Sequence, residues 1–173
     1  MFLLAASQST SPREPAVFDT SPLVFLDLLG YVSFLQRLHG RVVLPEAVAR
    51  ELTAHPGLPG SEVPSLEWVE RRTPGAESVR HVRREPPALG DGETEAIALG
   101  LELSCLVVLD DRRARLRARR AGLRVTGTLG ILLRLHRLRL AERELEADIA
   151  LMEEAGMRLS PELRRAVLDS GAG

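Results

Sequence analysis

The sequence predicts an α/β protein, a three-layer α/β/α sandwich on a mostly parallel central sheet with extra helices at the C-terminal end. Short apolar runs alternate with longer amphipathic segments along most of the chain, as in strand-helix-strand units. A length of 173 residues and an apolar content of 45% suffice for one domain with a substantial core. Aromatic residues make up only 3%, so we expect a core of Leu, Val, Ile and Ala.

The first half of the chain begins with a loose extension, expected at 1–14, before a single domain at 15–169. Apolar run 16–18 is the first strand, and the next helix begins near Ser21, because Pro22 suits a first helical turn. The elements expected after it are helices at 21–29 and 31–38, a strand at 42–44, a helix at 45–54, a loop at 55–65 and a short edge strand within 66–72.

The second half repeats the alternation after a polar segment, 74–90, whose structure the pattern leaves open. A helix is expected at 93–103, followed by a buried strand in "SCLVVLDD" and a helix that ends at Gly122. A short strand in "LRVTG" comes next, and the remaining helices are expected at 128–140, 142–154 and 162–168. The alternation therefore extends almost to the C-terminus.

Cysteine content and hydropathy indicate a cytoplasmic protein. The single cysteine, Cys105, lies in an apolar run and is expected to be a buried thiol without a disulfide or metal role. The first residues carry no basic segment typical of a signal peptide, and no apolar run approaches the length of a membrane span.

Two of the predicted strands end on carboxylates. Asp19 follows the first strand, and Asp110 and Asp111 follow the strand in "SCLVVLDD". If these strands are neighbours at a topological switch point, their carboxylates face each other across a crevice. Buried like charges repel unless a cation lies between them, and carboxylates without His or Cys favour Mg²⁺ or Mn²⁺.

Helical acids extend this candidate site. Glu51 flanks the apolar face of the helix at 45–54, and Glu95 shares a face with Leu99. A carboxylate beside a buried stripe is costly without a partner. Glu93 lies one position off that face, so both remain candidates, with Glu95 favoured by its face.

Each acid also has a structural explanation. Asp19, Asp110 or Asp111 could cap the helix that follows. Asp91 is expected to be an N-cap, and Glu93 suits the positive end of a helix dipole. Capping does not explain why four acids fall at one edge of one sheet.

With these residues assembled, the chain resembles the PIN-domain nucleases, in the small prokaryotic branch that includes toxin-type ribonucleases. The resemblance covers about residues 17–168. The segments that carry it are "VFDTSPL", "VLPEAVARELT", "GDGETEAIALGLEL", "VVLDDRRARLRARRAGLRVTGTLGILL" and "GMRLSPELRRAVL".

The resemblance implies one or two Mg²⁺ or Mn²⁺ ions at a sheet edge and metal-dependent hydrolysis of RNA phosphodiester bonds. Catalytic roles are implied for Asp19, Glu51, Glu95 and Asp110, with metal held by Asp19, Glu95 and Asp110. Thr20, Glu93 and Asp111 are auxiliary candidates, and Thr128 could contribute a hydroxyl. Arg112 and Arg115, nearest the strand end, are expected to bind the RNA backbone.

Partners implied by the resemblance are an RNA substrate and an antitoxin protein, if the chain is the toxin of a toxin–antitoxin pair. An alternative function is a PIN-fold protein that binds RNA or a protein without cleavage. A homodimer is also expected, because segment 130–140 is apolar on more than one face and needs cover. Alternatively, the two helices that follow fold back over it.

Two other families with acids at a sheet edge fit less well. A haloacid-dehalogenase-like phosphatase needs a second Asp two residues after the first, where this chain has Ser21. Such phosphatases and receiver domains also rely on a lysine, whereas all 23 basic residues here are arginine.

Overall fold

A computed structural model describes residues 14–86 and 88–171, so the predicted extension at 1–14 lies outside the described residues except for Glu14. In this part of the chain one five-stranded sheet has the order β3-β2-β1-β4-β5, and every pair is parallel. Its strands are β1 (Ala16–Phe18), β2 (Val42–Pro45), β3 (Val69–Arg72), β4 (Leu106–Val108) and β5 (Val125–Thr126). The predicted parallel α/β sheet, with its edge strand within 66–72, is confirmed.

Alternate residues of the central strands face two separate hydrophobic cores. Ala16 and Phe18 of β1 pack into one core, and Val17 between them packs into the other. Val43 of β2 and Val107 of β4 join Val17, while their neighbours along each strand face the opposite side. Successive strand side chains point to opposite faces, so a sheet buried on both faces needs helices on both.

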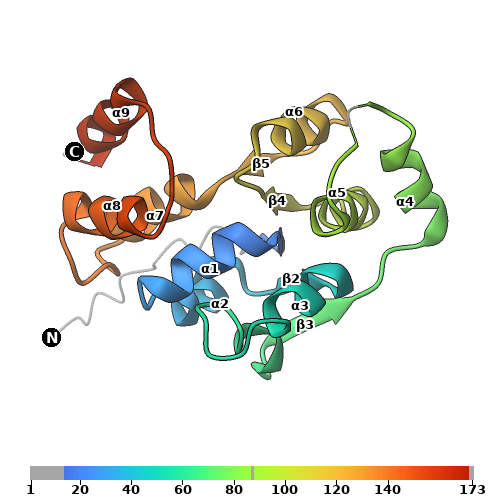
Figure 1. The fold of residues 1–173 in the computed structure, drawn as a ribbon, viewed down its shortest axis with the longest axis horizontal. Coiled ribbons are helices and arrows are strands. Elements are labelled where there is room, and N and C mark those ends of the chain that lie inside the picture. The colour runs from blue at the N-terminus through green and yellow to red at the C-terminus, as the bar shows by residue number, and fades with distance from the viewer. Residues whose placement is uncertain (1–13, 87, 172–173) are drawn as a thin grey trace, which may run out of the picture.

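Helices cover both faces and complete the three predicted layers (Figure 1). They are α1 (Thr20–Leu28), α2 (Val32–His39), α3 (Glu46–Thr53), α4 (Ala76–Arg83), α5 (Asp91–Leu103), α6 (Arg112–Arg120), α7 (Thr128–Arg137), α8 (Leu145–Glu154) and α9 (Pro161–Gly171), with a short 3-10 helix at Val63–Ser65. The first two helices and α7 pack in the core of Phe18, and α5 and α6 pack in the core of Val17.

Among the differences from the sequence-based expectation, three concern α4, Asp91 and α8. Helix α4 forms in the segment left open, where Val82 is its one fully buried side chain, too few for a periodic pattern. The expected N-cap role of Asp91 is wrong: Gly90 is the N-cap, and Asp91 accepts a hydrogen bond from Arg83 at 2.6 Å. Helix α8 begins at Leu145, three residues later than predicted.

The C-terminal helices cover α7 within one chain. Ile131, Leu132 and Leu135 of α7 share a core with residues of α8 and with Val167 of α9. These helices gather at one side of the molecule, on the left of Figure 1. Most of the apolar surface of 130–140 is therefore covered within one chain, although Leu138 stays exposed. This segment no longer requires a second protein surface, and the homodimer stays a prediction.

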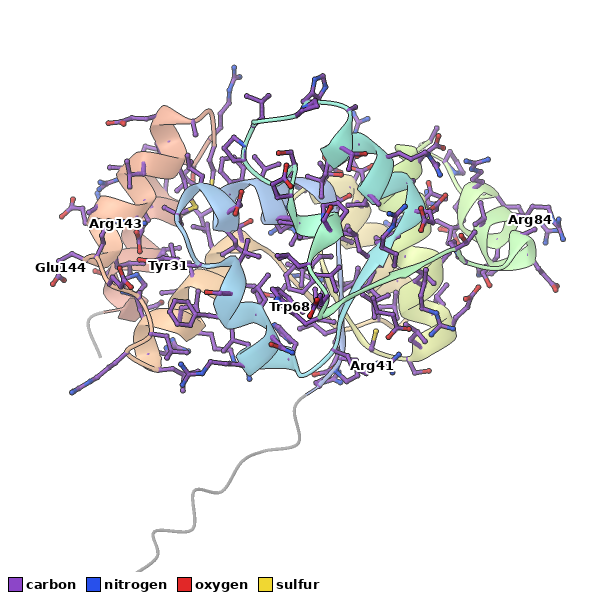
Figure 2. The ribbon with its side chains drawn as sticks, turned by 90° about the horizontal axis from the view of Figure 1, so that it is seen from below. Tyr31, Arg41, Trp68, Arg84, Arg143 and Glu144 are labelled. Atoms are coloured by element: carbon purple, nitrogen blue, oxygen red, sulfur yellow. The ribbon has the colours of Figure 1, made fainter. Side chains whose placement is uncertain are left out.

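A buried carboxylate ties this C-terminal group to the rest of the fold. Asp148 of α8 accepts hydrogen bonds from Tyr31 (2.8 Å) and Arg143 (2.8 Å), and its Oδ2 lies 2.9 Å from Nε2 of His136. The guanidinium of Arg143 also lies 5.3 Å from the centre of the Tyr31 ring, and both side chains meet in Figure 2. His136 is thus a structural residue.

The structure bears on two further predictions, the buried thiol of Cys105 and the lack of a membrane span. Cys105 is buried and free, and burial raises the pKa of its thiol. Within the described ranges, no helix combines the length and apolar character needed to cross a lipid bilayer.

Candidate active site

Asp19 and Asp110 lie at the same edge of the sheet because β1 and β4 are parallel neighbours. Phe18 pairs with Val108 in the register of the two strands, and the amide of Asp19 donates a hydrogen bond to the carbonyl of Val108 at 3.1 Å. From β1 the sheet continues to β2 on one side and to β4 on the other. This is the topological switch point where α/β sheets place their ligand sites.

Asp19 is a buried carboxylate with like charges around it. It occupies the N-cap position of α1 but makes no side-chain cap hydrogen bond, and it is only 6% exposed. Burial raises its pKa from 3.8 to about 7, and repulsion from Glu93, Glu51 and Asp110 acts in the same direction. Among the described residues no arginine or histidine forms an ion pair with it. Asp19 therefore lacks the neutralising partner that a buried carboxylate needs.

Gly92 lets two carboxylates approach the first turn of α5. A Cβ at this position would lie 3.0 and 3.1 Å from the oxygens of Glu51 and 3.2 Å from Oδ1 of Asp19. A larger residue would push at least one carboxylate away. The Thr20 hydroxyl donates a hydrogen bond to Oε2 of Glu51. Side chains from α1 and α3 thus meet at the N-terminal end of α5.

Asp110 and Asp111 both bind helix N-termini. Asp111 caps α6, because its Oδ1 accepts hydrogen bonds from the amides of Arg113 (2.7 Å) and Ala114 (2.8 Å). Asp110 reaches the start of α7, where its oxygens accept the amide of Thr128 at 2.8 Å and the hydroxyl of the same residue at 2.5 Å. The capping explanation thus applies to Asp111 and in part to Asp110, but not to Asp19.

The structure separates the two acids in "GETEAI". Glu95 turns toward α3, where its carboxylate accepts the amide of Ala47 at 2.8 Å and lies 3.9 Å from Arg50. Glu93 accepts the amide of Gly90 at 2.9 Å, and it repels both Asp19 and Glu51. Burial, with repulsion from Asp111 and Glu51, raises the pKa of Glu93. The charge of Glu93, rather than that of Glu95, is therefore coupled to Asp19.

A family model described as a PIN domain matches residues 15–171. This chain belongs to the PIN-domain family. A search among curated proteins gives no match. PIN domains are generally nucleases, and the fold described above is of the nuclease type.

PIN nucleases typically use divalent metal ions. Hard carboxylate oxygens suit Mg²⁺ or Mn²⁺, and the crowded Asp19 would gain from a cation beside it. Within 14–86 and 88–171, however, no three His, Cys, Asp or Glu side chains lie close enough together to hold one ion. The carboxylate oxygens of these acids are the donor atoms that such an ion prefers, but no three of the described acids are gathered around one point. Asp110 accepts hydrogen bonds from the amide and the hydroxyl of Thr128.

The arginines after the acidic edge of this PIN domain fall into two groups. Arg117 is buried and structural: it donates to the carbonyls of Val82 and Glu85 and pairs with the Glu85 carboxylate. Arg112 and Arg115 have no ion-pair partner among the described residues, and Nη1 of Arg115 lies 3.3 Å from where a Gly127 Cβ would stand.

The sequence did not predict that Gly92 belongs to this site, because "GDG" signals only a helix start.

Proposed function

We propose that this PIN domain is a metal-dependent ribonuclease that hydrolyses RNA phosphodiester bonds. Asp19 is the observation that carries the proposal. It is buried at the topological switch point, its side chain makes no cap hydrogen bond at the start of α1, and the charged groups that act on it are carboxylates rather than arginines. Such a group destabilises the folded chain, and perturbed carboxylates of this kind concentrate at functional sites.

Asp19, Glu51, Glu93 and Asp110 are the residues that would hold Mg²⁺ or Mn²⁺. A bound cation would supply Lewis-acid activation of water and neutralise charge on the phosphate. We assign the third acid to Glu93, because Glu95 is occupied at the N-terminus of α3. The hydroxyl of Thr20 positions Glu51 beside Asp19. Arg112 and Arg115 would orient the RNA backbone next to these carboxylates.

A second candidate function is RNA or protein binding without cleavage. Both oxygens of Asp110 already accept hydrogen bonds from Thr128, and no three acids converge among the described residues. A toxin role and an antitoxin partner remain predictions from the resemblance to small prokaryotic PIN proteins. A homodimer and a cytoplasmic location, which were expected from the sequence itself, also remain predictions.

Cleavage of end-labelled RNA tests the proposal. Wild-type protein is incubated with single-stranded and hairpin RNA in Mg²⁺, in Mn²⁺ and in EDTA, and the product ends are analysed. We expect cleavage only with a divalent ion, leaving 5′-phosphate and 3′-hydroxyl ends. RNA binding without cleavage in either ion would favour the second candidate.

A matched pair of variants tests which glutamate contributes. Glu93→Gln removes a charge coupled to Asp19 and should lower the cleavage rate by about a hundredfold. Glu95→Gln keeps a carbonyl oxygen that can accept the Ala47 amide, so it should retain most activity. The opposite ranking of the two variants would return the role to Glu95.

A further inference from the structure

A cavity of about 410 Å³ opens beside the acidic edge. Asp110 forms part of its wall, together with residues of α1, of α7 and of the connection between α8 and α9. Its volume lies in the range of about 300–1,000 Å³ typical of small-ligand pockets. The cavity therefore joins the candidate site to the C-terminal helices.

Two arginines line this cavity without a carboxylate partner. They are Arg115 of α6 and Arg158 of the α8–α9 connection. Within the described ranges neither forms an ion pair or a side-chain hydrogen bond, whereas Arg164 of α9 pairs with Glu146 and Glu153. Unpaired guanidinium groups beside a cavity suit phosphate, which they can bind in a bidentate manner.

The rest of the cavity wall is largely apolar, and it suits a flat apolar group. Phe25, Leu129, Met157, Leu159 and Leu163 contribute side chains to it. Nucleobases stack on apolar and aromatic surfaces irrespective of sequence. The apolar wall thus suits the base of a nucleotide, and the two neighbouring guanidinium groups suit its phosphate.

A helix-ending turn presents this wall. Gly156 has a φ of +103°, which favours glycine, and follows the C-terminus of α8. The amide of Met157 donates a hydrogen bond to the carbonyl of Met152 at 2.9 Å, and the amide of Gly156 donates one to the carbonyl of Glu153 at 3.0 Å. These two hydrogen bonds form a Schellman motif, which fixes the direction of the chain after the helix. Residues 157–159 are thus part of a built surface.

We propose that this cavity binds one nucleotide of a single-stranded RNA next to the bond that is cut. Arg115 and Arg158 bind its phosphate, and the apolar wall holds its base. The proposal rests on the proposed ribonuclease function, since Asp110 belongs to both sites. It assigns to Arg158, which lies far along the chain from the acidic motifs, a role in RNA binding.

Binding of a short fluorescent oligouridylate, measured by anisotropy in EDTA, tests the subsite without cleavage. Arg158→Ala should weaken binding about tenfold and reduce the salt dependence, because one phosphate contact is lost. Arg165→Ala is the matched control, since this exposed arginine of α9 lies outside the cavity lining. Equal affinities for the two variants would overturn the proposal.

The apolar wall is tested with a second pair of variants and an abasic RNA. Leu163→Ser should weaken oligouridylate binding about fivefold and leave binding of the same backbone without bases unchanged. Leu138→Ser, an exposed leucine outside the cavity lining, should change neither. A loss of affinity for Leu163→Ser that is equal on both RNAs would contradict base binding.

Cleavage in Mg²⁺ keeps the two proposals distinguishable. If wild-type protein cuts RNA but Arg158→Ala binds as tightly as Arg165→Ala, the subsite is wrong and the ribonuclease stands. If wild-type protein neither binds nor cuts RNA, both are wrong. Thermal unfolding of each variant confirms that a loss of binding does not come from a loss of folding.

Discussion

Asp19 and Asp148 are two buried carboxylates with opposite surroundings. Asp148 is fully buried, and its oxygens are met by Arg143, Tyr31 and His136. Asp19 is 6% exposed, and the charged groups that act on it are other carboxylates. The same side chain at similar burial is thus neutralised in one region and left crowded in the other.

The difference shows that burial alone does not distinguish a structural carboxylate from a functional one. A buried charge is tolerated when it is paired and hydrogen-bonded, and it then links the elements that supply its partners. A buried charge whose neighbours have the same sign lowers stability and favours any cation that binds there. Partners, rather than exposure, separate the two roles.

The largest expected effect belongs to Asp19→Asn, which removes the crowded charge and keeps the shape. RNA cleavage should fall about a thousandfold or more, because several kcal/mol of metal-assisted catalysis are lost. An Asn variant that cuts RNA at the wild-type rate in Mg²⁺ would contradict the proposed site.

The same variant should be more stable than the wild type when both are free of metal. The pKa of Asp19 is raised in the folded state, so the wild type loses stability as pH rises from about 4 to about 7. At pH 8 the gain on substitution should be on the order of 4 kcal/mol. Thermal unfolding in EDTA measures it, and Mg²⁺ should raise the melting temperature of the wild type alone. A less stable Asn variant would show that Asp19 is structural.

Asp148→Asn should have the opposite effect on stability. Tyr31, His136 and Arg143 would face an amide in place of a buried carboxylate. We expect the free energy of unfolding, measured with urea, to fall by about 3 kcal/mol. Asp169→Asn on exposed α9 is the control and should change little. A neutral result for Asp148 would remove the contrast with Asp19.

His39 provides a third arrangement, a buried group that stays neutral. Burial lowers its pKa from 6.5 to about 4, and its Nε2 has no hydrogen-bond partner among the described residues. The unfolded chain takes up this proton first, so stability should fall as pH drops from about 6.5 to 4. At pH 5 the loss is about 2 kcal/mol, and His39→Leu should remove this slope. Unfolding curves across the pH range measure it; an unchanged slope would contradict neutral burial.

The smallest expected effect is that of Tyr31→Phe. One hydrogen bond to Asp148 is lost while Arg143 and His136 remain, so the cost should be about 1 kcal/mol. RNA cleavage should be unaffected, because Tyr31 lies at the C-terminal group and not at the acidic edge. A change in RNA cleavage without a change in stability would contradict this prediction and would connect Tyr31 to the acidic edge.

The sequence predicted the sheet and its edge because strand alternation and strand-end acids are local patterns. Phe18 and Asp19 stand next to each other in the chain, and parallel pairing then brings Asp110 to the same edge. Helix periodicity favoured Glu95 over Glu93, and the choice between them stays a prediction. Periodicity gives the direction of a side chain, but the partner of Glu95 is an amide of α3, 48 positions away.

The C-terminal cover could not be predicted for a similar reason. An apolar stripe on 130–140 shows that a helix needs cover, but it does not say whether another chain or a later helix supplies it. Asp148 is one of four acids within α8, and its three partners come from three other segments. Such long-range pairings leave no periodic signal.

The hydrogen bonds between Asp110 and Thr128 make the start of α7 a competitor for any cation that uses Asp110. A cation that bound Asp110 in place of these donors would do so at the expense of a helix cap. Each 1.4 kcal/mol held in the cap would then weaken the apparent cation affinity about tenfold. By reciprocity, such a cation would loosen the first turn of α7 to the same extent. Under the proposed function, the metal affinity of the acidic edge would thus depend partly on the stability of a helix terminus.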